Sequence, residues 1–379
     1  MEGDKDMKHS IKTLSICIIG LLVCCMASCK KEEIKNMSYS YGDMNGNYIL
    51  SDNGFFSIKD ELVHFKSEDT HEDIIFCFDP ACAHEPASEK NPDPECRAAL
   101  FVTQTKIAYH DEYIYYFNQS DSFNFELYRM NIDDGVRELI GEYPYAFSPL
   151  LYAFYGDHLY CNAKIMEEPE VGHALMSYGV LLEININTGE YRILMERDEE
   201  SNYAVKELDV QGNTLFAKVP GEDGDSLIRL NLETLEQTVV IEKMNFQEKM
   251  YKGIYDSDSF YYCSLNEIGI SNYVSGEDIV LITPGENNIF TSFYISNRGI
   301  IYSVNTVNRD GVEKVLFYDV STKETIDITE KQEAIGGIHT YNGYLNKIVW
   351  SVKSEPDENG RITVVGYDIM NMAAFLGEN

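Results

Sequence analysis

Three cysteines and one histidine lie within a stretch of twenty residues in the first third of the chain. They are Cys77, Cys82, His84 and Cys96, and we call them the Cys/His centre. Thiolate sulfur and imidazole nitrogen are preferred donors for zinc, and four such donors can close a tetrahedral site. The spacing, C-x4-C-x-H-x11-C, differs from the standard zinc-finger and zinc-ribbon spacings. The centre is therefore a candidate zinc site with an unusual ligand spacing.

A disulfide is the alternative interpretation, because an exported domain lies where thiols can oxidise. A Cys82–Cys96 bond would close a Pro-rich loop of about fifteen residues and contribute about 3 kcal/mol. Cys77–Cys96 is a second pairing, and either one leaves a thiol over. Since unpaired thiols outside the cytoplasm are a liability, the residues favour a disulfide or an inert structural role over a metal. Cys161 and Cys263 follow a Tyr within aromatic strands, and we expect both to be buried as small apolar residues.

The centre also resembles an element found in certain bacterial lipoproteins, chiefly of anaerobic gut-type bacteria, that carry a β-propeller domain of unknown function. That element reads Cys-x-x-Pro-x-Cys-x-His…Cys and follows the first blade. Here it falls on Cys77, Pro80, Cys82, His84 and Cys96. The resemblance extends through the repeats over most of the mature chain. It implies a propeller fold and a lipid anchor, and it implies no activity.

The elements that must position this centre are short aromatic strands that recur along the chain. Each copy follows a small or polar turn, and several are followed by a second strand that ends in another turn. A period of roughly 40 to 50 residues with about four short strands per unit is typical of propeller blades. The copies lie at 53–59, 113–117, 156–162, 212–218, 258–264, 297–303 and 342–350.

Both faces of these strands carry apolar bulk, as the copy at 113–117 shows. Tyr113, Tyr115 and Phe117 share one face because strand residues alternate sides. Ile114 and Tyr116 share the other face. Each small sheet therefore needs cover on both sides, which radially arranged neighbours supply. We predict an all-β chain that forms a seven-bladed β-propeller, with six or eight blades also compatible.

The N-terminal stretch resembles the leader of bacterial lipoproteins. A basic segment begins at Met7, which we expect to be the natural start, and an apolar run at 14–23 is too short to span a bilayer comfortably. The leader ends at Ala27 and Ser28, the small residues that precede the cysteine in such leaders. The resemblance implies that Cys29 is acylated and becomes the first mature residue. Lipid chains there would anchor the protein, since each buried methylene contributes about 0.8 kcal/mol.

These features divide the chain into three parts. We expect a lipoprotein signal peptide at 1–28, a lipidated cysteine with a flexible tether at 29–46, and a single propeller domain at 47–379. The predicted location is extracytoplasmic, at the bacterial membrane or cell surface.

The chain is strongly acidic, with 30 Lys and Arg against 63 Asp and Glu and a net charge of −33. Such a surface repels nucleic acid and anionic lipid, which excludes a nucleic-acid role. The expected contact with the membrane is through the lipid anchor alone, and we expect a monomer. We expect the negative charge to contribute to solubility more than to the binding of partners, although it could attract cations.

Three hypotheses of function follow. The favoured one is a non-catalytic scaffold that displays loops to a protein, peptide or glycan ligand. The second is an extracellular glycan lyase or hydrolase with carboxylates at the channel mouth, and the third is a metal or redox sensor built on the Cys/His centre. No Gly-rich phosphate loop, nucleophile elbow or His-Glu-x-x-His occurs in the chain. A non-catalytic role is therefore favoured over an enzyme, and zinc is the one cofactor that we consider.

Overall fold

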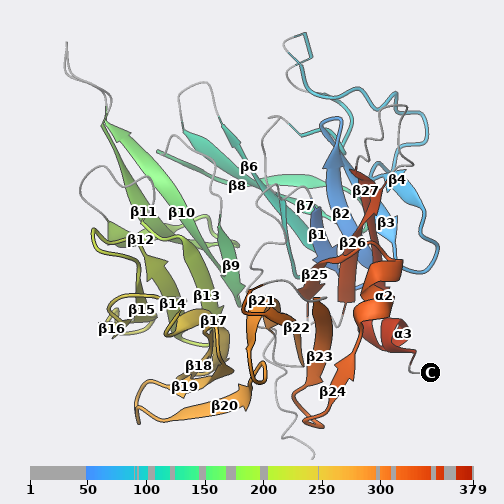
Figure 1. Ribbon diagram of the computed structural model, residues 1–379. Helices are drawn as coiled ribbons and strands as arrows, with labels where there is room; N and C mark the ends of the chain where they lie inside the picture. Colours follow the sequence, from blue (N-terminus) through green and yellow to red (C-terminus); the bar gives the residue numbers. More distant parts are fainter. Residues whose placement is uncertain are drawn as a thin grey trace, which may run out of the picture. The chain divides into compact units, whose positions relative to one another are not determined.

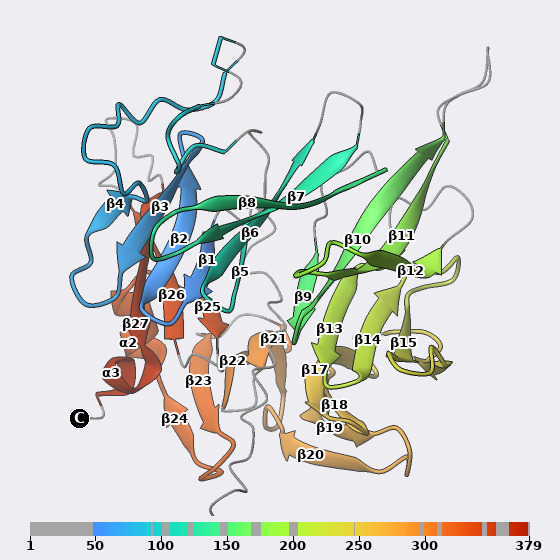
Figure 2. The ribbon, with the colours of Figure 1, turned by 180° about the vertical axis from the view of Figure 1, so that it is seen from behind.

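A computed structural model gives the fold shown in Figure 1 and Figure 2. It describes residues 48–377 apart from 89, 92–93, 101–106, 120–123, 145–150, 168–175, 197–203, 246, 296–298, 309–312, 343–346 and 354–363. The described residues all belong to one compact unit, Met37–Asn379. Cys29, the predicted signal peptide at 1–28 and the tether at 29–46 lie outside them. None of the helices in the described part of the chain is long and apolar enough to cross a membrane.

Seven antiparallel sheets follow one another in the described residues, and six of them have four strands. The seventh has three strands, and two short helices, α2 (Thr329–Ala334) and α3 (Met372–Leu376), lie beside the last two sheets in the chain. In every sheet the strands are neighbours in the order of the sequence, so each sheet is one continuous segment (Figure 1). We number the sheets 1 to 7 in chain order.

The strands of sheets 1 to 4 are β1 Tyr48–Ser51, β2 Gly54–Lys59, β3 Leu62–Ser67, β4 Asp73–Ile75, β5 Ile107–His110, β6 Tyr113–Gln119, β7 Phe125–Asn131, β8 Arg137–Tyr143, β9 Tyr152–Tyr155, β10 His158–Glu167, β11 Met176–Asn185, β12 Tyr191–Glu196, β13 Glu207–Gln211, β14 Thr214–Val219, β15 Ser226–Asn231 and β16 Gln237–Ile241. Those of sheets 5 to 7 are β17 Met250–Asp256, β18 Ser259–Cys263, β19 Ile268–Asn272, β20 Asp278–Ile282, β21 Asn288–Ile295, β22 Gly299–Thr306, β23 Lys314–Asp319, β24 Thr325–Asp327, β25 Ile338–Asn342, β26 Lys347–Lys353 and β27 Val364–Asn371.

The aromatic repeats of the sequence form the second strand of each sheet: β2, β6, β10, β14, β18, β22 and β26. In sheet 2 the two faces of β6 pack as their alternation predicts. Tyr115 and Phe117 face sheet 3, where the Phe117 ring stacks on Tyr152 with centroids 5.3 Å apart. Ile114 and Tyr116 belong to the apolar cluster shared with sheet 1. The prediction of an all-β propeller is confirmed.

Each pair of neighbouring sheets shares one cluster of buried apolar side chains. The series includes the pair that closes the ring, where Leu50 and Phe55 of sheet 1 pack against Val349 and Ile369 of sheet 7. No strand is shared between these two sheets in the described residues, because β1 pairs only with β2 and β27 only with β26. Among the described residues, side chains therefore join the two sheets at this seam.

A nearly buried lysine reinforces the seam. Lys347 at the start of β26 is 4% exposed, and its ammonium group donates hydrogen bonds to the main-chain oxygens of Ser51 and Asp52. Its counter-ion is Glu68, 2.6 Å away, which follows β3. On the same seam, Lys66 donates to the main-chain oxygen of Tyr367 over 3.1 Å. Polar contacts thus supplement the smaller apolar cluster between sheets 7 and 1.

The turn between the third and fourth strands repeats in sheets 2 to 6. An Asn or Asp ends the third strand, and its side chain accepts hydrogen bonds from main-chain N–H groups at the start of the turn. The residue four positions later has positive φ and donates its N–H to the main-chain oxygen of that Asn or Asp. The Asn or Asp residues are Asn131, Asn185, Asn231, Asn272 and Asp319, and the positive-φ residues are Gly135, Gly189, Leu235, Gly276 and Lys323. Asx side chains stabilise such turns by substituting for main-chain acceptors.

Candidate metal centre

The Cys/His centre lies in the long connection between sheets 1 and 2, which runs from the end of β4 to the start of β5. Cys77 is the second residue after the strand, and its N–H donates to the main-chain oxygen of Ile75 over 2.8 Å. The chain then turns at Asp79, whose side chain accepts from Ala81 N at 2.8 Å and whose main-chain oxygen accepts from Cys82 N at 3.2 Å. This tight turn brings the second cysteine back toward the first.

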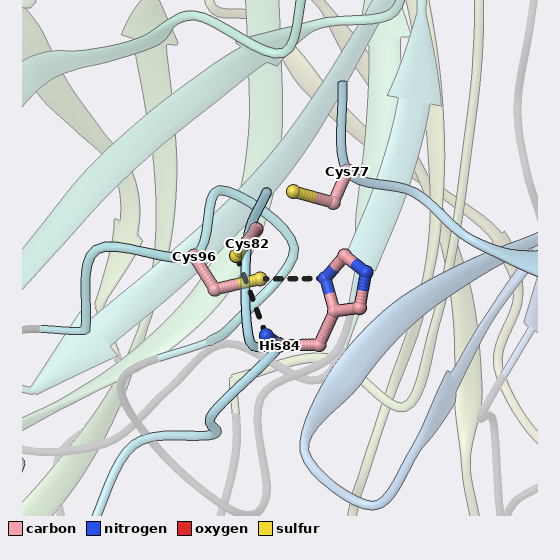
Figure 3. A group of neighbouring side chains, drawn as sticks. All are labelled: Cys77, Cys82, His84 and Cys96. Carbon is pink, nitrogen blue, oxygen red and sulfur yellow. Dashed lines mark hydrogen bonds between the residues drawn. The ribbon is translucent and has the colours of Figure 1, made fainter. Parts of the chain in front are cut away.

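His84 follows the turn with φ of +53°, a left-handed conformation that is uncommon for residues other than glycine. Its N–H donates to the sulfur of Cys82 over 3.4 Å, and its imidazole Nδ1 lies 3.7 Å from the sulfur of Cys96. The unusual backbone conformation and the two contacts together direct the imidazole toward the thiols (Figure 3).

The returning part of the connection runs beside β3 and holds the fourth ligand. Val63 N donates to the oxygen of Ala98 over 2.7 Å, and Leu62 forms a bridge with Ala99. Cys96 is 2% exposed and belongs to a small apolar cluster with Leu62 and these alanines. The main chain of sheet 1 thus fixes the position of Cys96.

The four ligand atoms converge on one point, as Figure 3 shows, and all lie within 4.8 Å of one another. With Zn–S bonds of about 2.3 Å and Zn–N bonds of about 2.0–2.1 Å, the corners of a tetrahedral site lie roughly 3.5–3.8 Å apart. The 3.7 Å between Cys96 Sγ and His84 Nδ1 falls in this range, and the widest pair would have to approach by about 1 Å. The centre could therefore bind a metal.

The surroundings of Cys96 favour a protonated thiol at this residue while no cation is bound. Burial, together with the neighbouring Cys82 and Cys77, raises the pKa of the Cys96 thiol to about 11. A metal ion reverses this preference, because a coordinating thiol is deprotonated outright. The arrangement is suited to a dication more than to a free nucleophilic thiolate.

The loop that carries the centre is attached to sheet 2 as well as to sheet 1. Arg137 at the start of β8 donates to the main-chain oxygens of Cys96 and, over 3.2 Å, of Arg97. Arg97 in turn donates to the oxygen of Asp134 over 2.6 Å. At Gly135 a Cβ atom would lie 2.9 Å from the ring of Phe78, so glycine allows the loop to pack on this turn. The sequence alone does not reveal these contacts, which only the fold brings together.

Cys161 and Cys263 lie outside the Cys/His centre. Cys161 in β10 and Cys263 in β18 are fully buried in different sheets, which confirms that they are small apolar residues of the core. The three cysteines of the centre are free thiols in the structure, and the two disulfide pairings stay predictions. Within the described part of the chain, the Cys/His centre is the one group of at least three His, Cys, Asp or Glu side chains whose ligand atoms converge as a metal site requires.

Comparison with known proteins gives a likeness of fold alone. No protein-family model matches the sequence, and no curated protein matches it. A post-proline cleaving enzyme from Rickettsia typhi superposes with a TM-score of 0.51 at 8% identity, over 86% of this chain and 53% of the enzyme. An oligogalacturonate lyase in complex with manganese gives a TM-score of 0.41 at 12% identity, over 67% of this chain and 74% of the lyase. TolB from Acinetobacter baumannii gives 0.37 at 10% identity, over 86% and 76% of the two chains.

Proposed function

We propose that the chain is a lipid-anchored, extracytoplasmic β-propeller that serves as a binding scaffold and holds one structural Zn²⁺ ion in its Cys/His centre. The observation that carries the metal assignment is the convergence of three sulfur atoms and one imidazole nitrogen within 4.8 Å. Soft thiolate ligands in a tetrahedral set select zinc over hard cations such as magnesium or calcium.

A structural role follows from the number of protein ligands. Structural zinc sites use four protein ligands, whereas catalytic sites keep one position open for water or substrate. Here Cys77, Cys82, His84 and Cys96 would fill all four positions. The ion would then join the exit of sheet 1 to the returning segment beside β3, while Arg137 joins the same segment to sheet 2. Binding free energy from the metal would stabilise the junction of the first two blades.

The scaffold role is supported by the closed ring and by the leader of the sequence. Seven sheets that pack through shared apolar clusters form a rigid base, and connecting loops can vary on such a base without loss of the fold. The lipoprotein-like leader would place this base outside the cytoplasm, anchored through Cys29.

The metal assignment is tested on the detergent-extracted full chain purified without added metal or chelator. We expect about one zinc per chain by elemental mass spectrometry, falling below about 0.1 in Cys82→Ser and Cys96→Ser. The matched control is Cys263→Ala, which removes a buried cysteine outside the centre and should keep its zinc.

Thiol titration separates zinc from the disulfide alternative. In a zinc-bound protein the three thiols react with a disulfide reagent only after a chelator is added. In a disulfide-bonded protein two of them appear only after a reductant, whatever the chelator. Full reactivity that depends on reductant alone, with no zinc in the sample, would overturn the zinc assignment.

The anchor is tested separately. Cys29→Ser should abolish labelling by a palmitate analogue and release the chain from the membrane fraction, whereas Cys77→Ser should do neither. Retention of Cys29→Ser in the membrane, with labelling intact, would contradict the proposed anchor.

A further inference from the structure

A cavity of about 270 Å³ opens between sheets 1 and 2, close to the Cys/His centre. Its walls come from the β1–β2 turn and strands of sheet 1, and from the β5–β6 and β7–β8 turns of sheet 2. Phe76 lines it and is the residue before Cys77. The cavity is therefore formed by side chains that the repeat places at the junction of two blades.

The apolar part of the cavity consists of Ile132 and four aromatic side chains, Phe56 and three rings grouped around it. Phe56, Phe76 and Tyr109 are 2%, 8% and 3% exposed, so the partly exposed Phe65 is the ring most open to the cavity. The ring centroid of Phe56 lies 5.0 Å from that of Phe65 and 5.0 Å from that of Phe76. Tyr109 of sheet 2 completes the group, with its ring 6.1 Å from Phe56. Aromatic faces carry negative quadrupole potential and attract cations, and quaternary ammonium groups are bound in such surroundings.

The polar part of the cavity carries three carboxylates and no positive side chain. Asp52, Glu112 and Asp133 line it, all on exposed turns, and none of them forms an ion pair within the part of the chain that the structure describes. The ammonium group of Lys347 donates a hydrogen bond to the main-chain oxygen of Asp52, and it already forms an ion pair with Glu68. The acidic charge of the cavity is therefore left uncompensated.

The pKa of the Tyr109 phenol is affected by the charges that line the cavity. Burial, together with the charges of Asp52 and Glu112, raises its pKa to about 12. Both carboxylates thus act on the aromatic wall, where they would also act on a bound cation.

We propose that this cavity binds a small organic cation through its ammonium group, with the partly exposed Phe65 ring on the apolar floor beneath the cation and the carboxylates around its rim. The inference rests on the proposed scaffold role and names the chemical class of its ligand. A bare metal ion fits less well, because no three acidic groups in the described residues converge as metal ligands do. The net charge of −33 adds long-range attraction for cations.

Calorimetry with three probes tests the proposal on the zinc-loaded, detergent-extracted full chain at low salt. Choline supplies a quaternary ammonium, N-acetyl-lysine amide supplies the primary ammonium of a peptide side chain, and 3,3-dimethyl-1-butanol is the uncharged isostere of choline. We expect choline to bind with a Kd of about 1 mM or lower and the isostere to bind at least about tenfold more weakly. The ratio of the Kd of choline to the Kd of the lysine derivative shows whether free quaternary amines or lysine side chains are the better ligands.

Variants of the rim carboxylates locate the site. Asp52→Asn and Glu112→Gln should each weaken choline binding about threefold, and the double variant about tenfold. Glu233→Gln, an exposed acid on sheet 4, is the matched control and should leave the Kd unchanged. Equal binding of choline and its isostere, no binding of either amine up to about 10 mM, or unchanged binding in the double variant would overturn the proposal. Zinc content and membrane attachment are unaffected by these outcomes, so failure here is separate from failure of the metal or anchor assignments.

Discussion

The guanidinium group of Arg137 in sheet 2 donates a hydrogen bond to the main-chain oxygen of Cys96, the ligand at the far end of the metal-binding loop. A side chain of the second blade thus holds a loop that leaves the first blade. Partners that orient metal ligands contribute to metal affinity, and their loss commonly costs 10- to 100-fold.

We predict that Arg137→Met lowers the zinc affinity of the chain about tenfold while one zinc per chain is still bound. The reason is that Cys96 loses its attachment to sheet 2 and keeps its thiol. Competition with a chromophoric chelator measures the affinity. Arg129→Met is the matched control, because Arg129 pairs with Glu138 on the same sheet and forms no hydrogen bond with the described residues of the loop. Equal affinities in the two variants would show that the Arg137 contact has no part in holding the site.

Substitution of Lys347 should destabilise the fold, because this residue joins sheet 7 to sheet 1. Lys347→Met should lower the free energy of unfolding by about 2–3 kcal/mol, because it removes a nearly buried ammonium from two main-chain oxygens and from Glu68. Lys243→Met is the control: its pair with Asp223 is 64% and 81% exposed, and a change within about 0.5 kcal/mol is expected. Urea denaturation followed by circular dichroism measures both. Similar losses in the two variants would contradict the importance of the seam.

The repeated turns predict a stabilising substitution. Leu235 has φ of +60° where sheets 2, 3 and 5 place glycine, and its side chain is 44% exposed. Relief of left-handed strain, about 1–2 kcal/mol, exceeds the extra chain entropy of glycine, so Leu235→Gly should raise the free energy of unfolding by about 0.5–1 kcal/mol. Leu235→Ala keeps the strain and should gain nothing. In the opposite direction, Gly189→Ala should cost about 2 kcal/mol, because its Cβ would meet the oxygen of Ile140.

Acid sensitivity should depend in part on Asp73 of β4. Burial alone would raise the pKa of this carboxyl, but the hydrogen bond and charge of Lys59, followed by His64, hold it below its ordinary value of 3.8. A carboxyl with a lowered folded pKa stabilises the fold fully above its unfolded pKa, and this stabilisation is lost as the pH falls through the folded pKa. Asp73→Asn should therefore flatten the decline of the unfolding free energy below pH 3.8, measured by urea titrations at several pH values. A decline that is as steep in Asp73→Asn as in the unsubstituted chain would contradict this role of Asp73.

The fold was predictable because its signal is repeated and local. Alternating residues such as Ile114 and Tyr115 carry apolar bulk on both faces of one strand, which requires cover on both sides, and neighbouring sheets provide it. The same turn chemistry, with an Asn or Asp at the end of the third strand, recurs in five sheets. A repeated pattern of this kind can be recognised in the sequence even where one copy is degenerate.

The candidate sites were predictable only in part. Cysteine and histidine are rare enough that Cys77 and His84 stand out in the sequence, and the spacing shows that they are close along the chain. The approach of Cys96 depends on its pairing beside β3, which no spacing rule contains. The acidic cavity could not be predicted, because Asp52 and Glu112 are two among 63 acidic residues and become neighbours only when two blades pack.

The seam between sheets 7 and 1 has a mechanical consequence. Because β1 and β27 belong to different sheets, no ladder of main-chain hydrogen bonds joins the first described strand to the last. A force applied between these two strands would load a few side chains one after another and not a row of parallel bonds. In an optical trap the ring should part at this seam at low force, and the remaining sheets should then unravel in sequence from their ends.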